Sequence, residues 1–252
     1  MPSGWFVMAW YEDWFDKDEY ELLYQNRDAS EAVQLADLVE YIVPVPLGSS
    51  LLDMGCGRGR HAIEFASRGF DITGVDLSAR SIDQARKHAR EAGLTIDFRR
   101  ADMRVPITDK SFDGVLNLFT AFGYFETMDE HQAAIDAMIH PLREDGFFVQ
   151  DFLNAERVIA ELVPEDSREI GDARVSQRRW IENDRIRKEI VFSQGGQSHT
   201  FFESVALLRL NDFLPMYNTA GLELIDVKGS YAGEDFGPDS SRMILFSKKQ
   251  SG

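Results

Sequence analysis

The chain has 252 residues, of which 44% are hydrophobic and 12% aromatic, so it can bury a sizeable core despite a net charge of −16. A protein this acidic repels a phosphate backbone, which disfavours nucleic-acid partners. One cysteine excludes an internal disulfide, and no apolar stretch approaches the roughly 18 residues that span a bilayer, so we expect a soluble, cytoplasmic protein without a membrane partner.

The first forty residues are the most acidic part of the chain. They contain ten acidic and two basic residues, which suits either a solvated helix surface or the attraction of a cationic substrate. Apolar residues at helical spacing then predict a helix over 30–42, which Pro44 ends. We expect residues 1–47 to form an N-terminal helical cap.

Strands and helices alternate along the next hundred residues. The pattern predicts, in chain order, a strand ending at Leu51-Leu52, a helix over 60–68, a strand over 72–75, a helix over 78–92, strands over 95–99 and 112–119, a helix over 128–140 and a strand over 146–152. Such alternation is typical of a doubly wound, mostly parallel α/β sheet that helices cover on both faces.

The apolar pattern changes after the fifth predicted strand. Three extended segments separated by turn-forming residues indicate a small antiparallel sheet, after which a helix and two strands return to the main sheet. The three extended segments are 173–182, 185–193 and 198–210. The helix covers 211–220, and the two returning strands cover 222–228 and 242–248. The predicted architecture is a seven-stranded α/β core, residues 48–167 and 211–252, with an inserted small antiparallel sheet, residues 168–210, as a substrate cover.

A glycine-rich loop lies between the first strand and the next helix of this core. Gly55, Gly57 and Gly59 let the backbone turn tightly and approach a ligand beside a helix N-terminus. Asp76 lies seventeen residues after Gly59, at the end of the second strand, where a carboxylate can accept hydrogen bonds from a ribose diol. The loop therefore indicates an adenosine-bearing cofactor, but Arg60 occupies the position where the dinucleotide fingerprint requires Gly or Ala, which disfavours NAD.

This ordered set of residues resembles the class I S-adenosylmethionine-dependent methyltransferases, over about 48–153 and less specifically through 248. In that family an acidic residue precedes the glycine loop, as Asp53 does, and others follow the second and third strands, as Asp76 and Asp102 do. The resemblance implies a Rossmann-like fold, S-adenosylmethionine as cofactor and no metal. It also implies cofactor contacts from the loop and the strand ends: Gly55, Cys56, Gly57, Gly59, Leu77, Met103, Leu118 and Phe119.

Within the family, the chain is similar to the small-molecule subgroup that includes sugar-amine N-methyltransferases. Its fourth strand lacks the Asn-Pro-Pro-aromatic motif used on nucleic-acid bases and protein amides, and the subgroup also inserts an antiparallel sheet after the fifth strand. Those relatives place an N-terminal aromatic and basic pair near the methionine carboxylate, which Tyr24 and Arg27 could match; the alternative is a surface helix. Trp5, Trp10, Trp14 and Phe15 would either cover the site or dock on the core.

Methyl transfer requires little catalytic machinery. A general base matters for a hydroxyl or ammonium acceptor and much less for a neutral amine or a thiol. The resemblance therefore implies a small-molecule acceptor, nitrogen slightly ahead of oxygen, with no catalytic residue assigned. Five residues at strand ends or in the cover are candidates for the acceptor pocket: Tyr124, His199, Glu203, Tyr231 and Arg242.

We expect 168–210, together with residues 1–28, to form the acceptor-side wall. Two other functions stay open at this point, an NAD-dependent oxidoreductase and a non-catalytic regulatory protein that binds an adenosine cofactor. The oligomeric state and the identity of the acceptor also stay open.

Overall fold

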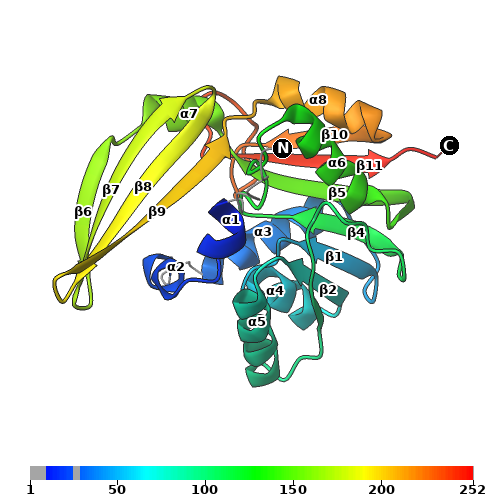
Figure 1. Ribbon diagram of the computed structural model, residues 1–252. Coiled ribbons are helices and arrows are strands. Elements are labelled where there is room, and N and C mark those ends of the chain that lie inside the picture. The colour runs from blue at the N-terminus through cyan, green and yellow to red at the C-terminus, as the bar shows by residue number, and fades with distance from the viewer. Residues whose placement is uncertain (1–9, 25–28, 252) are drawn as a thin grey trace, which may run out of the picture.

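The computed structural model describes residues 10–24 and 29–251, which form two β-sheets with helices around them (Figure 1). The first part of the core contains α3 (Ala29–Ile42), β1 (Ser50–Met54), α4 (Arg60–Ser67), β2 (Asp71–Asp76), α5 (Ala79–Glu91) and β3 (Asp97–Arg100). The second part contains β4 (Phe112–Asn117), α6 (Met128–Ile139), β5 (Leu142–Leu153), α7 (Ala155–Ala160), α8 (Leu210–Thr219), β10 (Leu222–Lys228) and β11 (Arg242–Lys249).

The larger sheet has seven strands in the order β10-β11-β5-β4-β1-β2-β3. Every neighbouring pair is parallel except those that β11 makes with β5 and β10. The chain leaves β1 toward β2 and β3 on one side and later returns to β4 on the other. The order therefore reverses between β1 and β4, and ligands of open α/β sheets bind outside the carboxyl ends of the strands at such a point.

Helices cover both faces of this sheet, as the alternation of strands and helices predicted. Leu51 packs in a buried cluster with α3, α4 and α5, whereas its neighbour Leu52 packs with α6 and α8 on the opposite face. Both leucines are fully buried because successive side chains of a strand point to opposite sides. The predicted doubly wound α/β class is confirmed.

A second, four-stranded antiparallel sheet follows α7 and stands beside the core (Figure 1). It consists of β6 (Glu165–Ile170), β7 (Ala173–Glu182), β8 (Arg185–Gln194) and β9 (Gln197–Ala206). Its last three strands correspond to the three predicted extended segments. The edge strand β6 escaped prediction because its sequence, Glu-Asp-Ser-Arg-Glu-Ile, is almost entirely polar and lacks an apolar alternation.

Two short N-terminal helices, α1 (Trp10–Trp14) and α2 (Asp18–Leu23), lie between the small sheet and the core (Figure 1). The indole of Trp14 is buried among Leu23, Val175, Ile190 and Phe192, and its ring lies 4.4 Å from that of Phe201. This apolar cluster attaches both helices to the inner face of the small sheet. Among the described helices, none combines the length and apolar character required to cross a bilayer.

Candidate active site

A cavity of about 630 Å³ lies where β1, β2, β3 and β4 end. Its wall contains backbone and side chains from the glycine loop, from the residues that follow β2, β3 and β4, and from α3 and α4. Tyr11, Phe15 and Tyr20 from the α1–α2 region complete it. The cavity therefore occupies the position that the strand order indicates for a ligand.

The three glycines of the loop share a backbone conformation but differ in what surrounds them. All have positive φ angles, +81° at Gly55, +53° at Gly57 and +81° at Gly59. A Cβ at Gly55 would lie 2.6 Å from that of Ala121, and one at Gly59 would lie 3.0 Å from both Ala85 and Phe98. A Cβ at Gly57 would meet no atom within 4 Å, so the space beside this backbone suits a ligand.

Asp76 lines the cavity and also holds the glycine loop. One carboxylate oxygen accepts the Gly57 N–H at 2.8 Å, and the other accepts the Ser78 N–H at 2.9 Å. These two backbone bonds fix the carboxylate at the cavity wall. A carboxylate fixed in this position can accept hydrogen bonds from the hydroxyls of a ribose.

Asp102 lies at the next strand end, flanked by apolar surface. Burial opposes its charge, but the guanidinium and the backbone N–H of Arg104 hold the pKa of this carboxyl below its ordinary value. Leu77 and Met103 line the cavity beside the two carboxylates. Two apolar residues next to acidic groups at adjacent strand ends suit a flat, polar-edged ring such as adenine.

Asp53 lies behind the loop, outside the cavity wall, and is only 1% exposed. One of its carboxylate oxygens has no hydrogen-bond partner. Burial, reinforced by the charge of Asp76, raises the pKa of Asp53 to about 7.

This raised pKa predicts a pH dependence of stability for the ligand-free protein. Native Asp53 binds a proton that the unfolded chain releases, so stability should fall as pH rises from about 4 to 7. Asp53→Asn should lose the contribution of this proton, so the slopes of the unfolding free energy against pH should differ between the two proteins by up to about 1.4 kcal/mol per pH unit. Urea denaturation of wild type and Asp53→Asn between about pH 4 and 7 measures this difference. Parallel plots of unfolding free energy against pH would show that Asp53 does not titrate in this range.

The segment after β4, residues 118–125, forms the other side of the cavity. Leu118, Phe119, Ala121, Tyr124 and Phe125 all line it. Phe119 and Thr120 have φ angles of +58° and +59°, which side-chain-bearing residues adopt at a cost. Tyr124 lies among the rings of Trp10, Tyr11 and Phe15, and its hydroxyl donates to the Thr120 carbonyl at 2.7 Å.

A fully buried carboxylate, Asp151 on β5, holds the left-handed turn at the start of this segment. It accepts the Phe119 N–H at 2.9 Å, the Tyr231 hydroxyl at 2.7 Å and the Arg242 guanidinium at 2.7 Å. Arg242 also donates to the Thr120 hydroxyl. Sequence reasoning did not single out Asp151; an acidic residue inside the apolar run Phe147–Phe152 was the available signal.

The structure places one of the five acceptor-pocket candidates, Tyr124, on the cavity wall. Tyr231 and Arg242 lie behind Phe119, bonded to Asp151. His199 is on an exposed part of the small sheet, with 60% of its side chain accessible, and contacts Glu19 at 2.8 Å. Glu203 lies between α1, α2 and the small sheet. Phe15, one of the aromatic residues expected either to cover the site or to dock on the core, lines the wall, and so do Tyr11 and Tyr20, which sequence reasoning did not assign.

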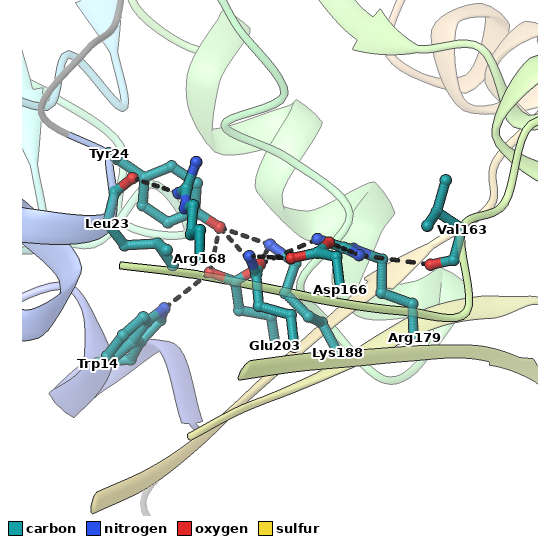
Figure 2. Close-up of polar contacts among 10 residues, drawn as sticks. Trp14, Leu23, Tyr24, Val163, Asp166, Arg168, Arg179, Lys188 and Glu203 are labelled. Carbon is teal, nitrogen blue, oxygen red and sulfur yellow. Dashed lines mark hydrogen bonds and ion pairs between the residues drawn. The ribbon is translucent and has the colours of Figure 1, made fainter. Parts of the chain in front are cut away.

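Figure 2 shows the surroundings of Glu203, a half-buried polar cluster between α1, α2 and the strands of the small sheet. Glu203 faces Lys188 across β8 and β9 at 2.8 Å and accepts the Trp14 indole N–H at 2.8 Å and the Tyr24 hydroxyl at 2.7 Å. Burial opposes the charge of Glu203, but Lys188 and these donors hold the pKa of its carboxyl below its ordinary value. The Arg168 guanidinium donates to the Leu23 carbonyl nearby, which adds a side-chain-to-backbone hydrogen bond between the sheet and α2.

Tyr24 is therefore directed at Glu203 and Lys188, and its hydroxyl accepts from Lys188 at 2.7 Å. Its backbone carbonyl accepts from Arg58, a residue of the glycine loop that lines the cavity. Arg27, its expected partner, lies outside the described residues, as does Trp5. Arg58 and Arg60 are the guanidinium groups that the structure places on the cavity wall near the loop.

Glu203→Gln should loosen α1 and α2. The amide keeps an acceptor for Trp14 but leaves the Lys188 ammonium without its charge partner, which should lower the free energy of unfolding by about 2 kcal/mol. Glu19→Gln is the matched control, because its contact with the exposed His199 joins the same two parts of the chain and exposed pairs contribute less than about 1 kcal/mol. Urea denaturation compares them, and equal losses would contradict the assigned role.

Within the described part of the chain, the small sheet contributes no residue to the cavity wall. The expectation that 168–210 forms the acceptor-side wall therefore differs from what is observed. The aromatic side chains of the α1–α2 region and of segment 118–125 line the cavity instead, and the small sheet packs behind Trp14 of α1.

Residues 51–146 match the family model described as a methyltransferase domain. The chain is 30% identical, over 231 residues, to dTDP-3-amino-3,4,6-trideoxy-alpha-D-glucopyranose N,N-dimethyltransferase of Streptomyces venezuelae. This similarity covers 86% of this chain and 93% of that relative.

Solved structures share the fold over nearly the whole chain. An S-adenosylmethionine-dependent methyltransferase from Clostridium acetobutylicum superposes with a TM-score of 0.78 at 17% identity, over 92% of this chain and 96% of its own. CalS10, an amino pentose methyltransferase from Micromonospora echinaspora, superposes with a TM-score of 0.71 at 24% identity, over 93% of this chain and 98% of its own. At these identities the likeness concerns the fold.

Proposed function

The chain belongs to the S-adenosylmethionine-dependent methyltransferases, and we propose that it methylates a neutral amine on a small molecule, with an amino sugar as the acceptor class. Bound S-adenosylmethionine supplies an electrophilic methyl group. The protein's own residues then have to hold the donor, orient the acceptor nitrogen and exclude water, and such positioning can contribute roughly 7 to 11 kcal/mol of the barrier.

We assign the donor to the side of the cavity formed by β1, β2 and β3. Asp76 would accept the ribose hydroxyls, Leu77 and Met103 would contact the adenine faces, and Asp102 would face the adenine amino group. The open space beside Gly57 supports a close backbone approach. Arg58 and Arg60 on the wall favour a carboxylate at the loop end.

The acceptor would enter on the other side of the cavity, next to segment 118–125. This placement follows from strand order, because β4 lies on the opposite side of β1 from the strands assigned to ribose and adenine. The wall there consists of aromatic side chains, among them Tyr11, Phe15, Tyr124 and Phe125. These rings can enclose a sugar face and attract an ammonium form before it loses its proton.

The observation that carries the choice of nitrogen is the composition of the cavity wall, whose two imidazoles, those of His61 and His88, belong to α4 and α5 and not to the aromatic side. Each carboxylate that lines the cavity is engaged by a backbone N–H group or by an arginine. Asp76 accepts from the glycine loop, Asp102 pairs with Arg104, and Glu64 pairs with Arg68. None of the three is placed by these contacts to act as a base on the aromatic side. A neutral amine needs no base to attack, whereas a hydroxyl does. The amino-sugar class is supported by the relative from Streptomyces venezuelae.

A matched pair of acceptors tests this proposal. S-adenosylhomocysteine formation is measured with a thymidine-diphosphate-linked amino sugar and with its counterpart that carries a hydroxyl in place of the amine. We expect methylation of the amine only, with a rate that rises with pH until the amine is fully deprotonated. Equal or greater turnover of the hydroxyl compound would contradict it. Cofactor binding without turnover of any amine would favour a non-catalytic regulatory protein instead.

We further propose that the protein acts in the cytoplasm and without a nucleic-acid partner. Its net charge of −16 supports the second point, because an acidic surface repels polyanions. The family resemblance to enzymes of small molecules supports a freely diffusing acceptor.

A further inference from the structure

We propose that Arg185, at the start of β8 in the small sheet, is a positioning residue for methyl transfer, and this inference rests on the proposed function. Arg185 does not line the cavity. Its guanidinium binds the main chain of the segment whose side chains form the acceptor side of the wall, Gly123 to Phe125, and thereby fixes Tyr124 and Phe125.

The guanidinium of Arg185 bonds three consecutive carbonyls. One terminal nitrogen donates to the Phe125 carbonyl at 2.6 Å, and the other lies 3.3 Å from that of Gly123 and 3.2 Å from that of Tyr124. On the sheet side, the group donates to the hydroxyl and the carbonyl of Ser204 at 2.7 and 3.0 Å. The planar fork therefore connects β8 and β9 to the cavity segment.

Arg185 occupies this place at an energetic cost. The residue is 6% exposed, and burial lowers the pKa of its guanidinium. Among the described residues, no carboxylate lies within ion-pair distance of it. A buried cation that bonds carbonyl and hydroxyl groups but has no carboxylate in ion-pair contact contributes little to stability compared with an apolar residue of similar size. Its contribution is therefore geometric, since a guanidinium presents five N–H donors in a rigid plane and a lysine cannot.

The segment that Arg185 binds needs such restraint. It leaves β4 through two left-handed residues, Phe119 and Thr120, and turns again at Gly123 with a φ angle of +90°. Asp151 fixes its beginning from the core, as described above, and Arg185 fixes its end from the small sheet. Ala206 adds one backbone bond to the Gly123 carbonyl at 2.8 Å. Without Arg185, Tyr124 and Phe125 would lose the restraint nearest to their own backbone.

The donor side of the cavity is independent of this contact. Residues assigned to ribose, adenine and the glycine loop lie at the ends of β1, β2 and β3 and have no hydrogen bond with Arg185 among those described. Loss of the guanidinium should therefore impair alignment of the acceptor and spare donor affinity. This separation distinguishes a positioning role from a general structural one.

The experiment compares Arg185→Ala, Arg185→Lys and Arg178→Ala. Arg178 lies on an outward-facing position of the same sheet, with its guanidinium 5.7 Å from the Trp180 ring, and serves as the matched control. Calorimetry measures S-adenosylhomocysteine affinity, and turnover of the amino sugar measures kcat and KM. We expect kcat/KM for the acceptor to fall by at least about tenfold in Arg185→Ala, with cofactor affinity within about threefold of wild type.

Chemical rescue provides a second readout. Millimolar methylguanidinium should restore part of the activity of Arg185→Ala, whereas urea, which has the same shape without the charge, should not. Arg185→Lys should stay impaired, because an ammonium cannot donate to all three carbonyls at once. If Arg185→Ala does not fold, Arg185→Lys decides the question by the same kinetic comparison.

Unchanged acceptor kinetics in a folded variant would overturn the proposal, and so would parallel losses of cofactor affinity and turnover. Amide hydrogen exchange keeps this test separate from the proposed function. Exchange in 119–125 should accelerate in the Arg185 variants but not in Arg178→Ala, whatever the acceptor is. If the wild-type protein methylates no amine but exchange in 119–125 still accelerates in the Arg185 variants, the proposed function fails and the restraint of this segment by Arg185 stands. If exchange in 119–125 is the same in the Arg185 variants as in wild type, the restraint by Arg185 is refuted.

Discussion

Gly57→Val should reduce S-adenosylmethionine affinity by at least about 100-fold while the protein remains folded. The φ angle at Gly57 is +53°, where a β-branched residue is strained, but an added Cβ meets no protein atom within 4 Å. The valine methyl groups would instead project into the space that the cofactor needs. Calorimetry with S-adenosylhomocysteine measures the loss, and circular dichroism confirms the fold.

Gly48→Val is the matched control for this experiment. Gly48 also has a positive φ angle, +83°, and open space around its missing Cβ, but it precedes β1 and does not line the cavity. Both variants should therefore lose a similar amount of stability, about 1 to 3 kcal/mol from backbone strain. Only Gly57→Val should lose the cofactor. Normal binding by Gly57→Val would show that the loop is only a turn.

Asp76→Ala should weaken S-adenosylhomocysteine binding by roughly 10- to 150-fold, or about 1.5 to 3 kcal/mol. The substitution removes the charged acceptor proposed for the ribose hydroxyls. It also removes the acceptor that holds the Gly57 N–H, so the loop loses a restraint at the same time. Asp76→Asn should lose less, because its amide keeps one acceptor oxygen.

Asp71→Ala provides the comparison from the opposite end of the same strand. Asp71 bonds Ser50 and Lys110, is half exposed and lies outside the cavity, so its loss should leave cofactor affinity unchanged. Titration calorimetry measures the S-adenosylhomocysteine affinity of Asp76→Ala, Asp76→Asn and Asp71→Ala. Equal affinities for wild type and a folded Asp76→Ala protein would eliminate the ribose assignment.

Local patterns in the sequence determined most of the core. The helical spacing in 30–42, the alternation of strands and helices from Leu51 onward and the glycine loop before Arg60 all correspond to elements of the structure. Such patterns report which face of an element is buried, and this depends on residues only a few positions apart. The same reasoning placed Asp76 and Asp102 at adjacent strand ends, because parallel strands end at one edge.

Elements with weak local signals escaped prediction. Strand β5 begins at Leu142 instead of 146, since residues 143–145 are polar and exposed and lie in an irregularity between the Leu142–Phe112 and Phe147–Gly114 pairs, where a pattern of apolar residues gives no signal. Edge strand β6 and the short helices α1 and α2 likewise depend on their neighbours. Helices of five or six residues are not stable alone, so their own sequence carries little information about them.

Only the tertiary structure decided how the acceptor side of the cavity is built. Tyr11 and Phe15 meet Tyr124 across more than a hundred residues of sequence, and the irregular segment that carries Tyr124 has no period from which its side-chain directions follow. Glu203, expected in the acceptor pocket, instead bonds Trp14, and Arg185, expected in the substrate cover, bonds the Phe125 carbonyl from behind the aromatic wall. The sequence by itself therefore determined the fold and placed the residues that we propose for the donor side, which regular strands present in order. The acceptor side depends on contacts between distant segments, whose geometry follows from packing and not from local pattern.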